Sequence, residues 1–174
     1  WRSVCQRLPA AAPMLRTTKV STCLFFAGQA EAAVQAYVAL IPGSRILAVH
    51  RYGPGAPLPE GSVMTISFEL AGTPCLAING PPVFQFTEAM SLVLTCADQA
   101  ELDRCWEALL AGGGQAQACG WLKDRFGVSW QVVPARLEEL LQAGDSAANA
   151  RLMGALWGMV KLDVAALERA HRGA

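Results

Sequence analysis

The stretch KVSTCLFFAGQAE at residues 19–31 has a counterpart in AMSLVLTCADQAE at residues 89–101. Each stretch opens with a run of apolar and β-branched side chains that is typical of a strand. Each then passes through a Gln-Ala-Glu triplet into a segment whose apolar residues recur at helical spacing. The chain is therefore predicted to repeat one strand-helix unit, and this repeat decides the fold.

Both predicted helices carry an apolar stripe at positions i, i+3, i+4 and i+7, which is the pattern of a helix that packs on a sheet. The stripes are Ala33, Ala36, Tyr37 and Leu40 in the first helix, and Leu102, Cys105, Trp106 and Leu109 in the second. Asp98 is the expected N-cap of the second helix, with Glu101 as its capping-box partner. Pro42-Gly43 and the run 112–114 are expected to end the two helices.

After each helix the chain is predicted to return as antiparallel strands. The predicted strands are 44–51, 63–70 and 74–79 in the first half, and 116–123 and 128–133 in the second. Ala71-Gly72 should make a tight hairpin, and Asp124 should bond the backbone of its own turn. Each half is then a strand, a helix and several antiparallel strands, in an α+β fold. Because one unit cannot cover its own sheet, we expect the two to pair around a ligand cleft.

The segments outside the repeat are expected to differ from it. Residues 1–16 show no periodicity and are predicted to be a disordered leader, with Met14 as a candidate natural start. Short helices are predicted after the repeat, with Asp145 and Asp163 as caps of the last two. The predicted plan is a leader at 1–16, one domain at 17–135 made of units at about 17–82 and 83–135, and a helical extension at 136–174.

Composition excludes several classes of protein. The 174 residues include 14 basic and 14 acidic side chains, so the formal net charge is +0. Neutrality argues against a nucleic-acid or anionic-membrane partner, because both require a basic excess. The apolar run from Leu152 to Val160 is about half of the ~20 residues that span a bilayer. The six scattered cysteines form no C-x-x-C pair and are interpreted as reduced core thiols of a cytoplasmic protein.

The chain resembles the PhnB-like branch of the vicinal oxygen chelate superfamily, which includes glyoxalase I, extradiol dioxygenases, and bleomycin and fosfomycin resistance proteins. This branch carries the label 3-demethylubiquinone-9 3-methyltransferase domain. The resemblance covers about residues 18–170, and NGPP at 79–82 departs from the usual NGGP. The matching stretches are FFAGQAEAAVQAY (25–37), GSVMTISFELAGTPCLAINGPPVFQFTEAMSL (61–92), DQAELDRCW (98–106), CGWLKDRFGVSWQVVP (119–134) and MVKLDVAALERA (159–170).

The resemblance implies duplicated βαβββ units with C-terminal helices, that is, the glyoxalase/bleomycin resistance/dihydroxybiphenyl dioxygenase fold. It also implies a homodimer and, in the enzymes of the superfamily, a divalent metal. The superfamily's first-strand ligands fall on Ser21 and Ser91, and its last-strand glutamate falls on Gln131. In the first unit the equivalent last-strand region offers Glu69 or Asn79. Neutral serines are poor ligands for divalent transition metals, so we expect no metal and no cofactor. One divalent ion near Gln131 is the alternative.

Strand alternation assigns residues to the expected cleft. Ser21, Cys23 and Phe25 should point away from the first helix, and Ser91, Val93 and Thr95 away from the second. Trp130 should instead pack against the second helix. The predicted ligand-binding residues are Ser21, Phe25, Phe68, Asn79, Phe84, Phe86, Ser91, Trp121, Ser129 and Gln131.

The sequence predicts a metal-free protein that binds a small amphipathic or aromatic molecule in this cleft. The alternatives are a metal-dependent lyase, isomerase or dioxygenase, and a structural or regulatory dimer with a vestigial cleft. Methyl transfer is not supported, because the run 112–114 follows a helix instead of joining a parallel strand to a helix. Whether the chain is an enzyme stays open at this point, and no residue is assigned as catalytic.

Overall fold

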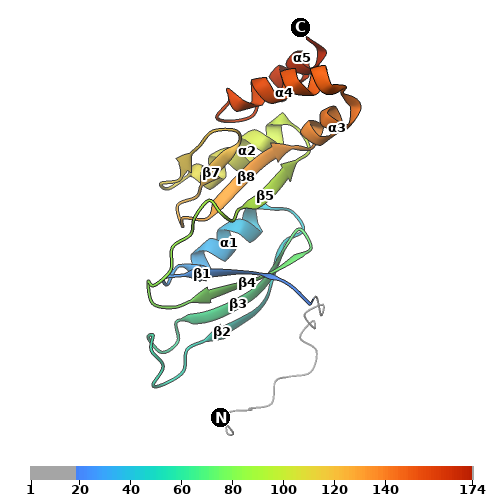
Figure 1. Cartoon of the computed structure of the whole chain (residues 1–174). Helices are drawn as coiled ribbons and strands as arrows, with labels where there is room; N and C mark the ends of the chain where they lie inside the picture. The colour runs from blue at the N-terminus through green and yellow to red at the C-terminus, as the bar shows by residue number, and fades with distance from the viewer. Residues whose placement is uncertain (1–18, 174) are drawn as a thin grey trace. The chain divides into compact units, whose positions relative to one another are not determined.

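The computed structural model describes residues 19–173 (Figure 1). The predicted leader at 1–16, with Met14, lies outside these residues. The chain divides into two compact units between Phe84 and Gln85, beside the predicted boundary at 82 and 83. Each unit is described by itself below.

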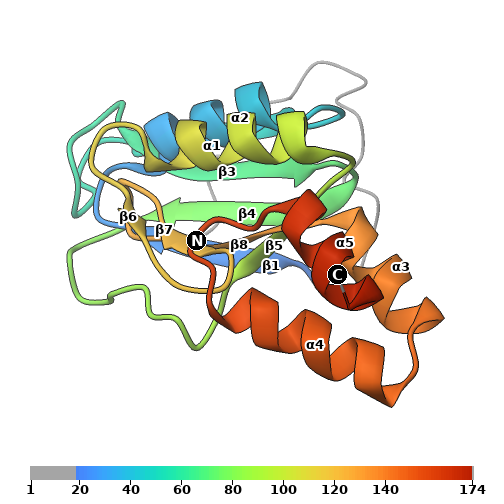
Figure 2. The ribbon, with the colours of Figure 1, turned by 90° about the horizontal axis from the view of Figure 1, so that it is seen from above.

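The first unit contains one four-stranded sheet in the order β1-β4-β3-β2, with β1 parallel to β4 and the other pairs antiparallel. Its elements are β1 Thr22–Phe26, α1 Ala30–Leu40, β2 Arg45–Arg51, β3 Val63–Leu70 and β4 Thr73–Asn79. Figure 2 shows α1 lying along one face of this sheet. The hairpin between β3 and β4 turns at Ala71 and Gly72, whose φ angles are 46° and 85°. The predicted hairpin is therefore confirmed.

The second unit repeats this pattern in the order β5-β8-β7-β6, again with the first strand parallel to the last. Its elements are β5 Leu92–Cys96, α2 Gln99–Leu110, β6 Gln115–Ala116, β7 Trp121–Lys123 and β8 Ser129–Pro134. All four residues of the predicted stripe on α2 are buried. In α1 the buried set shifts to Ala30, Ala33, Val34 and Tyr37, so Ala36 and Leu40 lie at its edge. Duplicated strand-helix-strand units are confirmed.

The predicted strand 116–123 is wrong as one element. The structure breaks it between β6 and β7, where Cys119 and Gly120 have φ angles of 61° and 80°. Their N–H groups donate to the carbonyls of Met159 and Val160, each at 2.8 Å. The predicted strand instead folds back on itself, so that β6 pairs with β7 as an antiparallel hairpin, and the N–H groups at its turn bond the chain that follows α4.

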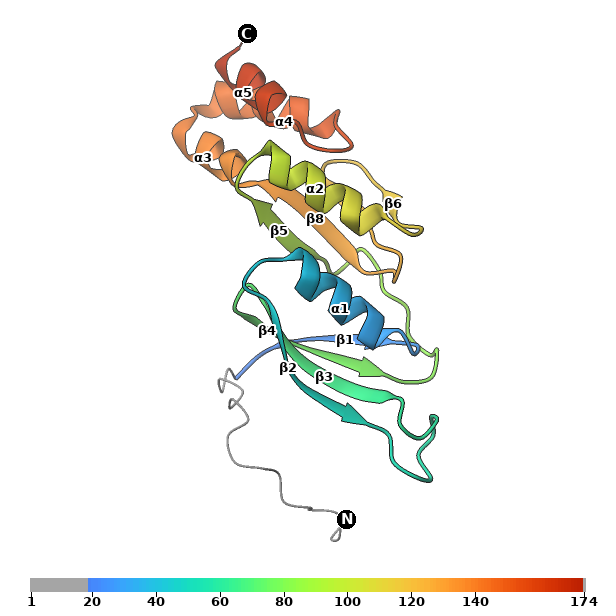
Figure 3. The same ribbon diagram turned by 180° about the vertical axis from the view of Figure 1, so that it is seen from behind.

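Three helices complete the second unit: α3 Ala135–Ala143, α4 Ser146–Trp157 and α5 Val164–Arg172. As predicted, Asp145 and Asp163 cap the last two, accepting bonds from Ala148 N at 2.8 Å and Ala166 N at 2.7 Å. Gln99 of α2 accepts from Val164 N and donates to the Leu162 carbonyl. The helices therefore pack on their own unit, and Figure 3 shows them grouped beside α2.

Asp124 holds the turn between β7 and β8, as the sequence predicts. Its Oδ1 accepts from Phe126 N at 2.9 Å and Val128 N at 3.0 Å. Its Oδ2 accepts from the Trp130 indole Nε1 at 2.9 Å. Asp124 is 5% exposed and Trp130 is 1% exposed, so the bonds are sheltered from water.

Asp124→Ala is expected to lower the free energy of unfolding by about 3 kcal/mol, because it leaves three donors without an acceptor, two of them buried. Urea unfolding followed by circular dichroism measures this change. Glu107→Gln, at an exposed position of α2, is the control and should stay within about 0.5 kcal/mol of the wild type. Equal stability of the Asp124 variant and the control would contradict this role.

Two glycines give a matched pair of substitutions. A Cβ on Gly80 would overlap the Phe25 ring, whereas a Cβ on Gly154 in α4 meets nothing within 4 Å. Gly80→Ala should therefore destabilise the protein by about 1–3 kcal/mol. Gly154→Ala should stabilise it by up to about 1 kcal/mol, because alanine favours the helix. Thermal unfolding of both variants checks the opposite signs, and a neutral Gly80→Ala would contradict the close approach.

Candidate functional site

Each sheet has one face covered by its helix and a second face, here called the open face. The strand registers assign side chains to these faces, since directly paired residues point the same way. In the second unit the open face carries Gln131 opposite both Val93 and Trp121, and Val133 opposite Thr95. Trp130 lies on the helix face, as predicted.

Gln131 and Ser91 meet on this open face, in agreement with the prediction that both side chains point away from α2. Gln131 Nε2 donates to Ser91 Oγ at 2.9 Å, and both residues are half-buried. Trp121 is also half-buried beside Gln131. The structure therefore brings together three of the predicted ligand-binding residues as a neutral polar pair next to an aromatic ring.

Ser129 lies on the same face, at the other end of β8. It is 1% exposed, and its Oγ has no hydrogen-bond partner among the described residues. Its register partner Lys123 pairs with Glu88 at 2.7 Å. The bonds from Lys123 and Gln117 lower the pKa of Glu88 to about 2. The segment before β5 is thus tied to the open face by ion pairing, and Phe86, half-buried in that segment, lies near Gly127.

In the first unit, Phe25 projects from β1 onto the open face and meets Phe84. Their ring centroids are 5.1 Å apart in an edge-to-face arrangement, and Phe84 is 68% exposed. Such an aromatic pair stabilises the structure by more than the burial of its apolar area alone. Ser21 precedes β1 and is exposed. Phe25 and Phe84 therefore form the aromatic surface that this unit presents.

The prediction that Phe68 and Asn79 line the ligand cleft is wrong, because both side chains lie on the helix face. Phe68 pairs with Cys75 in register and is 0% exposed, so it belongs to the core under α1. The Asn79 side chain accepts from Ala30 N at 2.9 Å and donates to the Val63 carbonyl at 3.0 Å. Asn79 therefore fastens the start of α1 to the sheet and, at 4% exposed, is not accessible to a ligand.

The residues at the superfamily's metal positions do not fit a transition metal. Ser91 and Gln131 are neutral and bond each other, and Glu69 is paired with Arg45 at 2.9 Å. Across residues 19–173, no three His, Cys, Asp or Glu side chains gather in a group that could hold a metal. A divalent ion requires a converging set of such donors.

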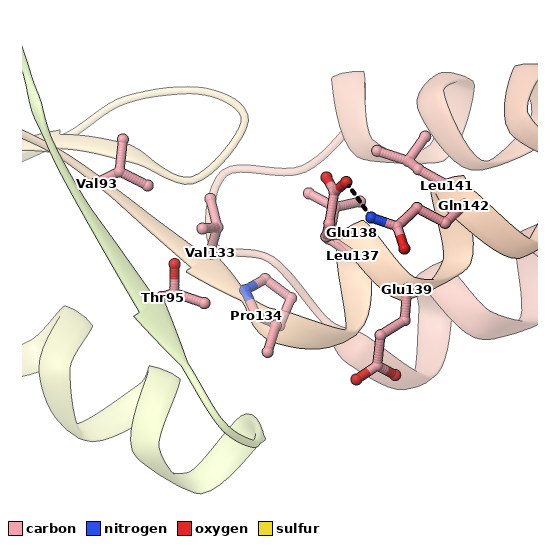
Figure 4. A pocket seen from close by; sticks show the side chains of 10 residues that line it. Val93, Thr95, Val133, Pro134, Leu137, Glu138, Glu139, Leu141 and Gln142 are labelled. Atoms are coloured by element: carbon pink, nitrogen blue, oxygen red, sulfur yellow. Dashed lines mark hydrogen bonds between the residues drawn. The ribbon is translucent and has the colours of Figure 1, made fainter.

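A groove that the sequence prediction missed lies where the open face of β5 and β8 meets α3 (Figure 4). Its volume is about 530 Å³, within the range of small-molecule sites. The lining residues are Val93, Thr95, Val133, Pro134, Ala135, Leu137, Glu138, Glu139, Leu141 and Gln142. The sequence feature that could have predicted this groove is the helical spacing of Pro134, Leu137, Glu138 and Leu141. These residues form a second face of α3, besides the face that buries Leu140.

The described cysteines are free. Burial, with the neighbouring Cys105 and Glu101, raises the pKa of Cys96 to about 12. A thiol held in its protonated form is a poor nucleophile, so Cys96 acts as a core residue. Among the described helices, none has the length and apolar character that crossing a membrane requires.

Comparisons with known proteins agree with this architecture. Residues 18–133 match the 3-demethylubiquinone-9 3-methyltransferase family. A PhnB protein from Bacillus cereus is 35% identical, with a TM-score of 0.64 over 68% of this chain and 100% of that one. A Pseudomonas aeruginosa protein is 25% identical, with a TM-score of 0.55 over 66% of this chain and 96% of that one.

A more distant likeness concerns the fold alone. The fosfomycin resistance protein FosX from Listeria monocytogenes is 14% identical, with a TM-score of 0.51 over 73% of this chain and 98% of that one. A search of curated proteins finds no match. The family match spans well over half of the chain, and the Bacillus cereus protein aligns over its whole length. The chain therefore belongs to the 3-demethylubiquinone-9 3-methyltransferase family, the PhnB-like branch of the glyoxalase/bleomycin resistance superfamily.

Proposed function

We propose that this chain binds a small amphipathic or aromatic molecule on the open face of its second unit, without a metal ion. The observation that carries the proposal is the Gln131–Ser91 pair, in which two neutral groups bond at the positions where the resemblance implies metal ligands. Trp121 and Val93 flank Gln131 and supply apolar walls. A few neutral polar groups on an apolar surface suit a ligand held by contact and oriented by hydrogen bonds.

Methyl transfer is not part of this proposal, despite the family's label. Gly112–Gly114 follows α2 and does not connect a parallel strand to a helix. A Cβ added at Gly114 would meet the Leu109 and Lys123 carbonyl oxygens at 2.9 Å, so this glycine serves close packing. The run therefore lacks the context of a cofactor-binding loop.

The homodimer and the cytoplasmic location stay predictions. Buried, unpaired thiols at Cys75, Cys96 and Cys105 support a reducing compartment. Sedimentation velocity of the full chain measures the oligomeric state directly, with a dimer expected and a concentration-independent monomer contradicting it.

A thermal-shift screen with neutral aromatic and quinone-like compounds tests ligand binding. We expect at least one compound to raise the melting temperature, because a ligand that binds only the folded state stabilises it. Gln131→Ala should reduce that shift by removing the orienting group. Gln35→Ala, at an exposed position of α1, is the matched control and should retain it. No shift with any compound would favour the vestigial cleft, and an undiminished shift in Gln131→Ala would remove Gln131 from the site.

Metal analysis tests the second half of the proposal. Protein purified without chelators should contain far less than one equivalent of nickel, zinc, iron or manganese, since the donors at Ser91 and Gln131 are neutral. Added divalent ions should leave the melting temperature unchanged. Stoichiometric metal that disappears in Gln131→Ala would contradict the proposal and favour the metal-dependent enzyme.

A further inference from the structure

We propose that the groove between β5, β8 and α3 selects an amphipathic cation, such as an arylalkylammonium ion, and that Glu138 recognises its positive charge. This inference rests on the proposed function, because the floor of the groove continues the open face that carries Gln131. To the proposed function it adds the chemical class of the ligand, a cation, and the residue that selects that class, Glu138.

The floor of the groove is apolar and adjoins the polar pair. Val93 is opposite Gln131, and Val133 is opposite Thr95, so the floor begins directly beside Gln131. Val93 is 60% exposed, which is high for an apolar residue within a sheet. Successive residues on one face of a strand are about 7 Å apart. A ligand whose aromatic ring lies beside Gln131, and which carries a chain of two or three bonds, would therefore reach toward α3.

The wall of the groove carries negative charge. Glu138 and Glu139 line it, and no lysine, arginine or histidine is among the described residues that do so. Glu139 accepts from Arg136 at 2.8 Å, and Arg136 also bonds Glu168 at 2.7 Å. Glu139 is thus already paired with a cation.

Glu138 has no cationic partner among the described residues. Its Oε1 accepts from the uncharged amide Nε2 of Gln142 at 2.7 Å, a bond that orients the carboxylate without neutralising its charge. Figure 4 shows Glu138 and Gln142 pointing toward each other while Glu139 points elsewhere. An oriented carboxylate above an apolar floor is complementary to a cation with an apolar body. An anion would instead meet like charge.

The wall also lies outside the part of the chain that defines the family. The family match ends at residue 133, before α3 begins at Ala135. The Bacillus cereus protein aligns over its whole length with 68% of this chain. Charge selection by Glu138 is therefore a property that the family match does not supply.

Three probes of similar shape test the inference: phenethylamine, which is cationic, phenethyl alcohol, which is neutral, and phenylacetate, which is anionic. Calorimetric titration of the wild type should give the amine about five-fold tighter binding than the alcohol, as for an ion pair open to solvent. Phenylacetate should bind most weakly. The preference for the amine should shrink at high ionic strength, because salt screens the charge.

Variants separate this inference from the proposed function. Glu138→Gln should make the amine and the alcohol bind equally, while Glu107→Gln, which removes the same charge from an exposed site on α2, should keep the preference. Gln131→Ala should weaken the alcohol as well as the amine. Equal binding of amine and alcohol by the wild type, or an unchanged preference in Glu138→Gln, overturns the cation assignment and leaves the open-face proposal standing. No binding of any of the three probes contradicts both.

Discussion

Side chains on a strand alternate between two faces, and in both units a single helix covers one of them. The helix faces hold the large buried residues, including Phe26, Phe68 and Trp130. The strand residues that can contact a ligand on the open face therefore come from the opposite parity. In the second unit that parity yields Val93, Gln131 and Val133 in adjoining positions. The parallel pairing of β5 with β8 is what places residues some 40 positions apart, such as Ser91 and Gln131, within one hydrogen bond.

Much of the fold follows from local patterns in the sequence. The stripe on α2, the caps at Asp98, Asp145 and Asp163, and the Asp124 turn each depend on residues within a few positions of one another. Short-range capping and turn chemistry can be recognised from type and spacing alone. The broken strand at 116–123 could not, because its geometry depends on bonds to Met159 and Val160, far along the chain.

The face to which a site residue points was predictable where the strand was well defined, because side chains alternate along it. Gln131 and Ser91 lie on the expected face, and Trp130 lies on the other. Phe68 and Asn79 do not lie as expected, because their facing depends on how β3 and β4 register against β1. Asn79 pairs with Phe26, so the register alone assigns it to the helix face. The groove is not predictable in the same way, because it depends on where α3 lies after β8 relative to the open face, and local spacing does not determine that position.

In this family member the open face of the second unit carries the hydrogen-bonded pair Gln131 and Ser91, where we propose that a ligand binds without a metal ion. The most direct test of this account is to measure intermolecular nuclear Overhauser effects between phenethyl alcohol and the protein in metal-free solution. The account predicts contacts with the methyl groups of Val93 and Val133. Contacts confined to residues outside the open face of the second unit, or seen only after a divalent metal is added, would contradict it.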